Sequence, residues 1–203
     1  MSQFALFLLG SPRTEIAGQE IRISRRKALA LLTYLAVTGQ SHTRDALATL
    51  FWPEQDQSRA RNSLRGALVS LRKALGEGWM EADRENVGLT HHLELVEGSD
   101  ASTSSGQGLW LDVAAFGSQL ADCQTHGHRP DEVCPACLPL LTGAAELYRG
   151  DFMDGFTLPD SPAFDEWQYF QSESLRDELA GTLERLAKGH AAQDEFEPAI
   201  AHA

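Results

Sequence analysis

The hydrophobic pattern is most regular over residues 57–75, where apolar side chains recur at the spacing of an amphipathic helix. One face of this helix would bury Ala60, Leu64, Ala67, Leu68, Leu71 and Leu75. The opposite face would carry Ser58, Arg61, Asn62, Arg65, Val69, Arg72 and Lys73. A helix on a protein surface usually mixes acidic and basic side chains, but this stretch contains no carboxylate. The pattern therefore predicts a helix with one buried face and one cationic face.

Short strands are predicted on both sides of this helix. An apolar run at residues 4–9 has no helical period, and residues 13–16 and 20–23 predict a hairpin around a Gly-containing turn. Residues 79–82 and 86–89 flank an Asp-Arg-Glu turn and predict a second hairpin. One hairpin thus precedes the helical segments of this region and the other follows them.

Two further helices are predicted between the first hairpin and the helix over 57–75. Ser24 can cap the first of them, and Gly39 can end it. Thr43 can cap the second, which is expected to stop at Trp52, directly before a proline. Strands, three helices and a hairpin in this order predict a winged helix, with the second hairpin as the wing.

The remainder of the chain predicts helices. Residues 97–108 are rich in Gly and Ser, which is typical of a flexible linker or extended loop. From Asp112, which can cap a helix, apolar residues recur at helical spacing, and the longest stripe runs over residues 164–187. We therefore expect a mixed fold, with a small α+β winged-helix domain at residues 1–96 and an all-α helical domain at residues 109–203.

The end of this helical domain has the spacing of a tetratricopeptide-like repeat. The spacing is carried by Leu183, Leu186, Ala187, His190 and Ala199. A second helix of the repeat would begin near Glu197 and need about a dozen residues, whereas the sequence ends at Ala203. Because a lone helix of a repeat leaves its apolar face uncovered, we expect an N-terminal fragment of a longer protein.

The charge of the chain is unevenly distributed. The 203 residues carry a net charge of −12, which taken alone disfavours DNA binding. Residues 1–90 carry +3 and residues 91–203 carry −15, so the two parts suit different partners. No apolar run reaches the length of a membrane span and no signal peptide opens the sequence, so we expect a cytoplasmic protein without a membrane partner.

The cationic helix face predicts contacts with double-stranded DNA, because Arg and Asn are the side chains that read guanine and adenine edges in the major groove. The candidates for groove contacts are Arg61, Asn62, Arg65 and Arg72, with Val69 on the same face. Ser58 and Lys73 lie near the helix ends and are expected to meet phosphates. Arg84 at the wing tip, and Thr43 and Arg44 at a helix start, are further candidates. The alternative is a basic surface helix without a ligand.

A second group of candidate residues combines all the cysteines of the chain with two histidines within 15 residues. The group is Cys123, His126, His128, Cys134 and Cys137. The CxxC spacing is typical of structural zinc, and a Cys₃His set would use one of the two histidines, with the choice between them open. The alternatives are buried thiols beside surface histidines, or a thiol–disulfide pair of Cys134 and Cys137. The strand that such a redox motif needs directly before it is not predicted here.

The order of these blocks resembles a known family. RRKALALLTYLA, TRDALATLFWPE, RARNSLRGALVSLRKAL and WMEADRENVGL are similar to the OmpR-type winged helix of SARP-type transcriptional activators. ELYRGDFMDGF and SPAFDEW are similar to the bacterial transcriptional activation domain of these regulators, a stack of tetratricopeptide-like helix pairs. The resemblance covers nearly the whole chain, although His190 stands where the repeat prefers Tyr.

The resemblance implies a transcription regulator that activates genes. Such proteins bind direct repeats as head-to-tail copies and recruit RNA polymerase through its sigma subunit. The sequence contains no nucleophile elbow, phosphate-binding loop, dinucleotide fingerprint or HExxH, so we do not expect an enzyme. The alternative functions are a helical-repeat scaffold for protein partners and a redox protein that uses Cys134 and Cys137.

Overall fold

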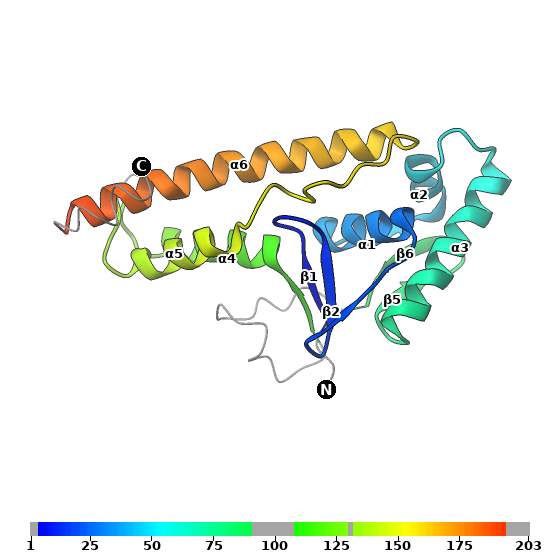
Figure 1. Ribbon diagram of the computed structural model, residues 1–203, viewed down its shortest axis with the longest axis horizontal. Coiled ribbons are helices and arrows are strands. Elements are labelled where there is room, and N and C mark those ends of the chain that lie inside the picture. The colour runs from blue at the N-terminus through cyan, green and yellow to red at the C-terminus, as the bar shows by residue number, and fades with distance from the viewer. Residues whose placement is uncertain (1–3, 91–107, 130–131, 194–203) are drawn as a thin grey trace.

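The computed structural model describes the chain except for residues 1–3, 91–107, 130–131 and 194–203. It contains seven described strands: β1 (Phe4–Phe7), β2 (Arg13–Ile16), β3 (Gln19–Ile21), β4 (His42–Thr43), β5 (Met80–Ala82), β6 (Asn86–Leu89) and β7 (Leu109–Leu111). The described helices are α1 (Arg26–Thr38), α2 (Arg44–Phe51), α3 (Gln57–Leu75), α4 (Asp112–Gln124), α5 (Cys137–Leu147) and α6 (Pro162–Ala191). Figure 1 shows α6 running along the molecule from α2 at one end to α5 at the other.

Two small sheets frame the N-terminal helices. The first has the strand order β3-β2-β1-β7, and the second has the order β4-β6-β5. Strands β5 and β6 are antiparallel and form the predicted wing, and β4 connects this wing to the residue that caps α2. The arrangement of strands, three helices and wing confirms the winged helix expected from the sequence.

The helix boundaries differ from the sequence expectation at two capping residues. The N-cap position of α1 is Arg25, which makes no side-chain cap, so the expectation for Ser24 is wrong. Asp112 is the first residue of α4 and not its N-cap. Its fully buried carboxylate accepts hydrogen bonds from the backbone N–H groups of Leu8 and Leu9, at 2.8–2.9 Å. Asp112 therefore holds the end of β1 against α4.

The segment expected to be wholly helical contributes one strand. Leu109, Trp110 and Leu111 are buried and form β7, which pairs parallel with β1. Three consecutive bulky apolar residues are typical of a short strand that is covered on both faces. Of the linker or loop expected at 97–108, residues 97–107 lie outside the described part of the chain, as does the repeat helix expected from Glu197. The division into domains at these positions stays a prediction.

An aromatic cluster joins the winged helix to α6. Phe51 of α2 lies 5.3 Å from Phe164, and Tyr34 of α1 lies 5.0 Å from Trp167, measured between ring centroids. Phe152 packs on Trp167 at 5.8 Å. One continuous hydrophobic core therefore extends from β1 and the three N-terminal helices to the first half of α6.

A second, smaller core lies between α4, α5 and the far end of α6. Its buried residues are Cys123, Cys137, Leu138, Leu141 and Leu186. Figure 1 shows that this end of α6 lies far from α3. None of the helices among the described residues is both long enough and apolar enough to cross a bilayer.

Candidate nucleic-acid interface

Helix α3 forms where the sequence predicts it, and its orientation follows from its buried face. The side chain of Asp56 caps the helix by accepting a hydrogen bond from the backbone N–H of Arg59 at 3.0 Å. Gly76, at a φ of 87°, ends it. The buried residues are the six predicted ones, and they pack α3 against α1 and α2. The cationic face is therefore turned outward.

All the predicted contact residues on α3 are exposed, namely Ser58, Arg61, Asn62, Arg65, Val69, Arg72 and Lys73. Val69 is 60% exposed, which is high for a large apolar residue in the middle of a helix. An exposed valine among arginines offers an apolar contact of the kind that recognises a thymine methyl group. The face thus combines cationic, amide and apolar groups.

Helix α3, the start of α2 and the wing tip enclose one hollow of about 920 Å³. Seven of the ten predicted DNA-contact residues line it: Thr43, Arg44, Arg61, Arg65, Val69, Arg72 and Arg84. Ser58, Asn62 and Lys73 lie outside it, on the neighbouring surface of α3. Three acidic residues that the sequence analysis did not identify as part of the site, Asp45, Asp83 and Glu85, also line the hollow.

Arg61 is already paired within this hollow. Its guanidinium donates two hydrogen bonds to Asp45, with Nε–Oδ1 at 2.6 Å and Nη2–Oδ2 at 2.7 Å. These hydrogen bonds lower the pKa of Asp45 and raise that of Arg61, so both groups are charged at neutral pH. The pairing joins residues 16 positions apart and depends on how α2 packs on α3. The sequence alone does not reveal it.

Arg44 and Thr43 have structural partners. Arg44 donates from Nε to the carbonyl of Asp83 at 2.8 Å, and its backbone N–H donates to the carbonyl of Glu85 at 2.7 Å. The hydroxyl of Thr43 accepts a hydrogen bond from the N–H of Ala46 and caps α2, as predicted. Arg44 therefore positions the wing tip relative to α2.

The wing tip is also stabilised from within. The Oδ1 atom of Asp83 accepts hydrogen bonds from the N–H groups of Glu85 at 2.7 Å and Asn86 at 2.6 Å. These bonds hold the pKa of Asp83 below its ordinary value. In this closed turn Arg84 is exposed. Within the described part of the chain, the side chains of Arg65, Arg72 and Arg84 form no hydrogen bond or ion pair, so these three cations are free to meet an anionic ligand.

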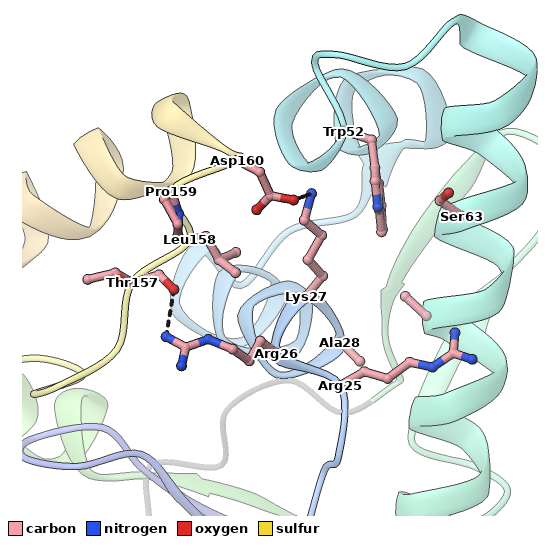
Figure 2. A pocket seen from close by; sticks show the side chains of 11 residues that line it. Arg25, Arg26, Lys27, Ala28, Trp52, Ser63, Thr157, Leu158, Pro159 and Asp160 are labelled. Atoms are coloured by element: carbon pink, nitrogen blue, oxygen red, sulfur yellow. Dashed lines mark hydrogen bonds and ion pairs between the residues drawn. The ribbon is translucent and has the colours of Figure 1, made fainter.

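A second hollow, of about 730 Å³, lies beside the start of α1 (Figure 2). Arg26 donates to the carbonyl of Thr157 at 2.7 Å, and Lys27 pairs with Asp160 at 2.8 Å. Arg25 extends toward α3, where its Nη1 atom would lie 3.1 Å from a Cβ at Gly66. Arg26 and Lys27 thus connect the winged helix to the segment that leads into α6.

The predicted cysteine and histidine group is brought together in part. The ligand atoms of His126, His128, Cys134 and Cys137 lie within 4.8 Å of one another. Cys123 is fully buried nearby, but its Sγ atom faces the backbone carbonyl of Cys137 at 3.9 Å. The structure therefore assembles both histidines with two cysteines, where the sequence favoured three cysteines with one histidine.

No protein-family model and no curated protein matched the sequence. Among solved structures, Mycobacterium tuberculosis EmbR in complex with a low affinity phosphopeptide is similar, with a TM-score of 0.68 and 20% sequence identity. The match covers 99% of this chain and 49% of the EmbR chain, so the chain spans about half the length of the structure that it matches. The shared fold confirms the mixed architecture of a winged helix followed by a helical part.

Proposed function

We propose that the chain is a sequence-specific DNA-binding transcription regulator, and that the exposed face of α3 reads the major groove. The observation that carries the proposal is the meeting of α3, the start of α2 and the wing tip around one hollow lined by five arginines. Cations from several elements that face one surface provide the electrostatic contact that a DNA backbone requires. Arg65 and Arg72 are the candidates for base contacts, and Arg84 is the candidate for the minor groove or the backbone.

The position of the acidic part supports this assignment. The net charge of −15 in residues 91–203 would repel DNA if this part lay beside α3. The described helices α4 and α5 lie at the opposite end of the molecule from α3 (Figure 1). These two helices therefore leave the surface of α3 open, whereas the start of α6 packs on α2.

The activating role rests on the resemblance to SARP-type regulators. By that resemblance, the protein recruits RNA polymerase, and copies of it bind head to tail on direct repeats. The residues that carry the resemblance, 146–156 and 161–167, lie on the segments that join α5 to α6 and on the start of α6. We therefore assign DNA contact to the winged helix, and we expect the helical part to contact its own winged helix, a neighbouring copy or RNA polymerase.

Selection of bound duplexes from a random pool tests the proposal. We expect an enriched sequence motif for the wild-type chain and its loss in Arg65→Ala/Arg72→Ala. Arg22→Ala is the control, because Arg22 is exposed and lies outside the hollow, and its substitution removes one positive charge where the double variant removes two. Equal enrichment by wild type and the double variant would show that α3 does not read DNA. No enrichment at low salt by any of the chains would favour a protein-binding scaffold.

A further inference from the structure

The cluster of His126, His128, Cys134 and Cys137 lies at the other end of the molecule from the DNA-binding surface, and the proposed function makes no use of it. His126 and His128 follow α4, Cys134 precedes α5, and Cys137 is its first residue. We propose that these four side chains bind one zinc ion as a closed, tetrahedral Cys₂His₂ site that fixes the α4–α5 connection to α6.

The distances between the ligand atoms fit such a site. The Sγ atom of Cys137 lies 3.1 Å from Nδ1 of His126, 3.0 Å from Nε2 of His128 and 3.5 Å from Sγ of Cys134. Cys134 Sγ lies 3.4 Å from Nδ1 of His126. Around a tetrahedral zinc ion with ordinary bond lengths, ligand atoms are about 3.3–3.8 Å apart. Two of the four contacts lie in this range and the other two are 3.0 and 3.1 Å, so a central ion requires the ligand atoms to move slightly apart.

The orientation of His128 is a second, independent indication of a metal. Its Nδ1 atom lies 2.8 Å from the backbone carbonyl of Arg129, which can only accept a hydrogen bond. Nδ1 therefore carries the proton, and the lone pair of Nε2 faces the cluster. Histidines that bind metals usually donate their other ring N–H to a carbonyl or carboxylate in this way.

The ligand types select zinc. Two thiolates and two neutral imidazoles in a tetrahedral arrangement are typical of structural Zn²⁺, whereas Mg²⁺ and Ca²⁺ require oxygen ligands. Four protein ligands leave no open coordination position, so the ion would have a structural role. Cys123 is left out of the proposed ligand set because it is not among the four residues whose ligand atoms all lie within 4.8 Å of one another.

The surroundings of the cluster show what the ion would stabilise. Val133, directly before Cys134, and Leu138, directly after Cys137, both approach Gly189 of α6. A Cβ atom at Gly189 would lie 2.9 Å from Cγ1 of Val133 and 2.7 Å from Cδ2 of Leu138. Zinc would thus hold the two residues that pack on α6 at fixed positions. Metal binding in such loops is coupled to their folding.

Metal analysis of the full chain, purified without chelator from zinc-supplemented medium, tests the stoichiometry. We expect one zinc ion per chain, and zinc-edge X-ray absorption that shows two sulfur and two nitrogen neighbours. Three sulfur neighbours would overturn the ligand set, because only Cys123 can supply the third. Absence of bound zinc would overturn the proposal as a whole.

Single substitutions identify the ligands. Cys134→Ser and His126→Asn alter side chains that are not fully buried, and we expect each to lose most of the bound zinc. Cys123→Ala is the matched control and should retain one zinc ion per chain. Circular dichroism establishes that each variant is folded. Retention of zinc by folded Cys134→Ser, or its loss from folded Cys123→Ala, would contradict the assignment.

Thiol titration separates zinc from redox chemistry. In Cys123→Ala, Cys134 and Cys137 should resist a thiol reagent until a chelator removes the metal, and both should then react. If the two thiols instead form a disulfide that a dithiol reductant opens, and the chelator changes nothing, the pair is a redox site and the zinc proposal is wrong.

Discussion

The guanidinium of Arg61 on α3 is held by the carboxylate of Asp45 on α2 through two hydrogen bonds of 2.6 and 2.7 Å. Both side chains are about half exposed, so the pair is in contact with water, and it lines the hollow that we assign to DNA. An exposed ion pair contributes little to the stability of a fold. Its main effect here is to hold an arginine of the recognition surface beside a negative charge.

Asp45→Asn is therefore expected to strengthen DNA binding. The change removes a negative charge from the hollow proposed to bind DNA and releases Arg61 for contact with phosphates. We expect roughly a tenfold gain in affinity at low salt, and a plot of log affinity against log salt that is steeper by about one unit. Titration of a fluorescent duplex over a series of salt concentrations measures both quantities.

The control for this prediction is Asp177→Asn, which removes the same charge from an exposed position on α6. It should leave affinity and salt dependence within twofold of wild type. Weaker binding by Asp45→Asn would mean that Asp45 holds Arg61 in the orientation that DNA requires. The pair would then support DNA binding by orienting Arg61 and would not weaken the binding.

Arg65 and Arg84 are expected to contribute to binding in different ways. Arg65 lies in the middle of the exposed face of α3, so Arg65→Ala should cost about 1–3 kcal/mol on the preferred site and relax its sequence preference. Arg84 lies at the wing tip, so Arg84→Ala should weaken all duplexes alike and reduce the salt slope by about one. Competition between specific and random duplexes distinguishes the two effects. Equal losses of affinity and of sequence preference in the two variants would show that Arg65 and Arg84 do not differ in this way.

Features of the site that depend on residues close together in the sequence could be predicted, whereas contacts between residues far apart in the sequence could not. The two faces of α3 could be predicted because helical periodicity is a local property, and all six residues expected to be buried are buried. The wing could be predicted from its turn residues. The pairs Arg61–Asp45 and Lys27–Asp160 join different elements, and no local pattern contains them.

The cysteine and histidine group shows the same limit. Spacing alone predicted five candidate ligands and favoured three cysteines with one histidine, whereas the fold brings together two cysteines and both histidines. Cys123 lies near the end of α4 in the same buried cluster as Cys137, but its thiol is not among the four ligand atoms that the fold brings within 4.8 Å of one another. Strand β7 could likewise not be predicted from a local pattern, because its partner β1 lies about a hundred residues earlier in the chain.

Phe164 is expected to be a main contributor to the junction between α6 and the winged helix. Its ring is fully buried and contacts Phe51 and Trp167, each at 5.3 Å. Phe164→Ala should lower the free energy of unfolding by about 3–5 kcal/mol, since it leaves a cavity among aromatic rings. Phe170 on the same helix is 60% exposed, so Phe170→Ala should change the free energy of unfolding by less than about 0.5 kcal/mol. Urea unfolding measures the free energy of both variants. Equal losses of stability would contradict a core shared by α6 and the winged helix.

Two glycines of α6 should respond to alanine with opposite signs. A Cβ at Gly181 meets nothing within 4 Å, so Gly181→Ala should stabilise the helix by about 0.5–1 kcal/mol. A Cβ at Gly189 would press on Leu138 and Val133, so Gly189→Ala should destabilise the chain by about 1–3 kcal/mol. Thermal unfolding of the two variants tests the close approach of the α4–α5 connection to α6. Stabilisation by both substitutions would show that Val133 and Leu138 do not pack closely against Gly189.

Asp112 is expected to make stability depend on pH in the direction opposite to most carboxylates. Burial raises its pKa from 3.8 to about 6, against the opposing effects of the N–H donors of Leu9, Leu8 and Val113 and of Arg149 at 3.8 Å. Between these two pKa values the folded chain holds a proton that the unfolded chain has released. The contribution of Asp112 to the free energy of unfolding is therefore largest below about pH 4 and is lost as the pH rises through about 6.

Urea unfolding of wild type and Asp112→Asn between pH 4 and pH 7 isolates this contribution. Asparagine keeps one acceptor oxygen and cannot titrate, so the variant should be less stable than wild type at pH 4, and the difference should shrink as the pH rises. Asp177→Asn, at an exposed position, should give a difference that hardly changes with pH. A difference for Asp112→Asn that grows with pH would show that the backbone donors outweigh burial. The carboxylate would then hold β1 against α4 in its charged form.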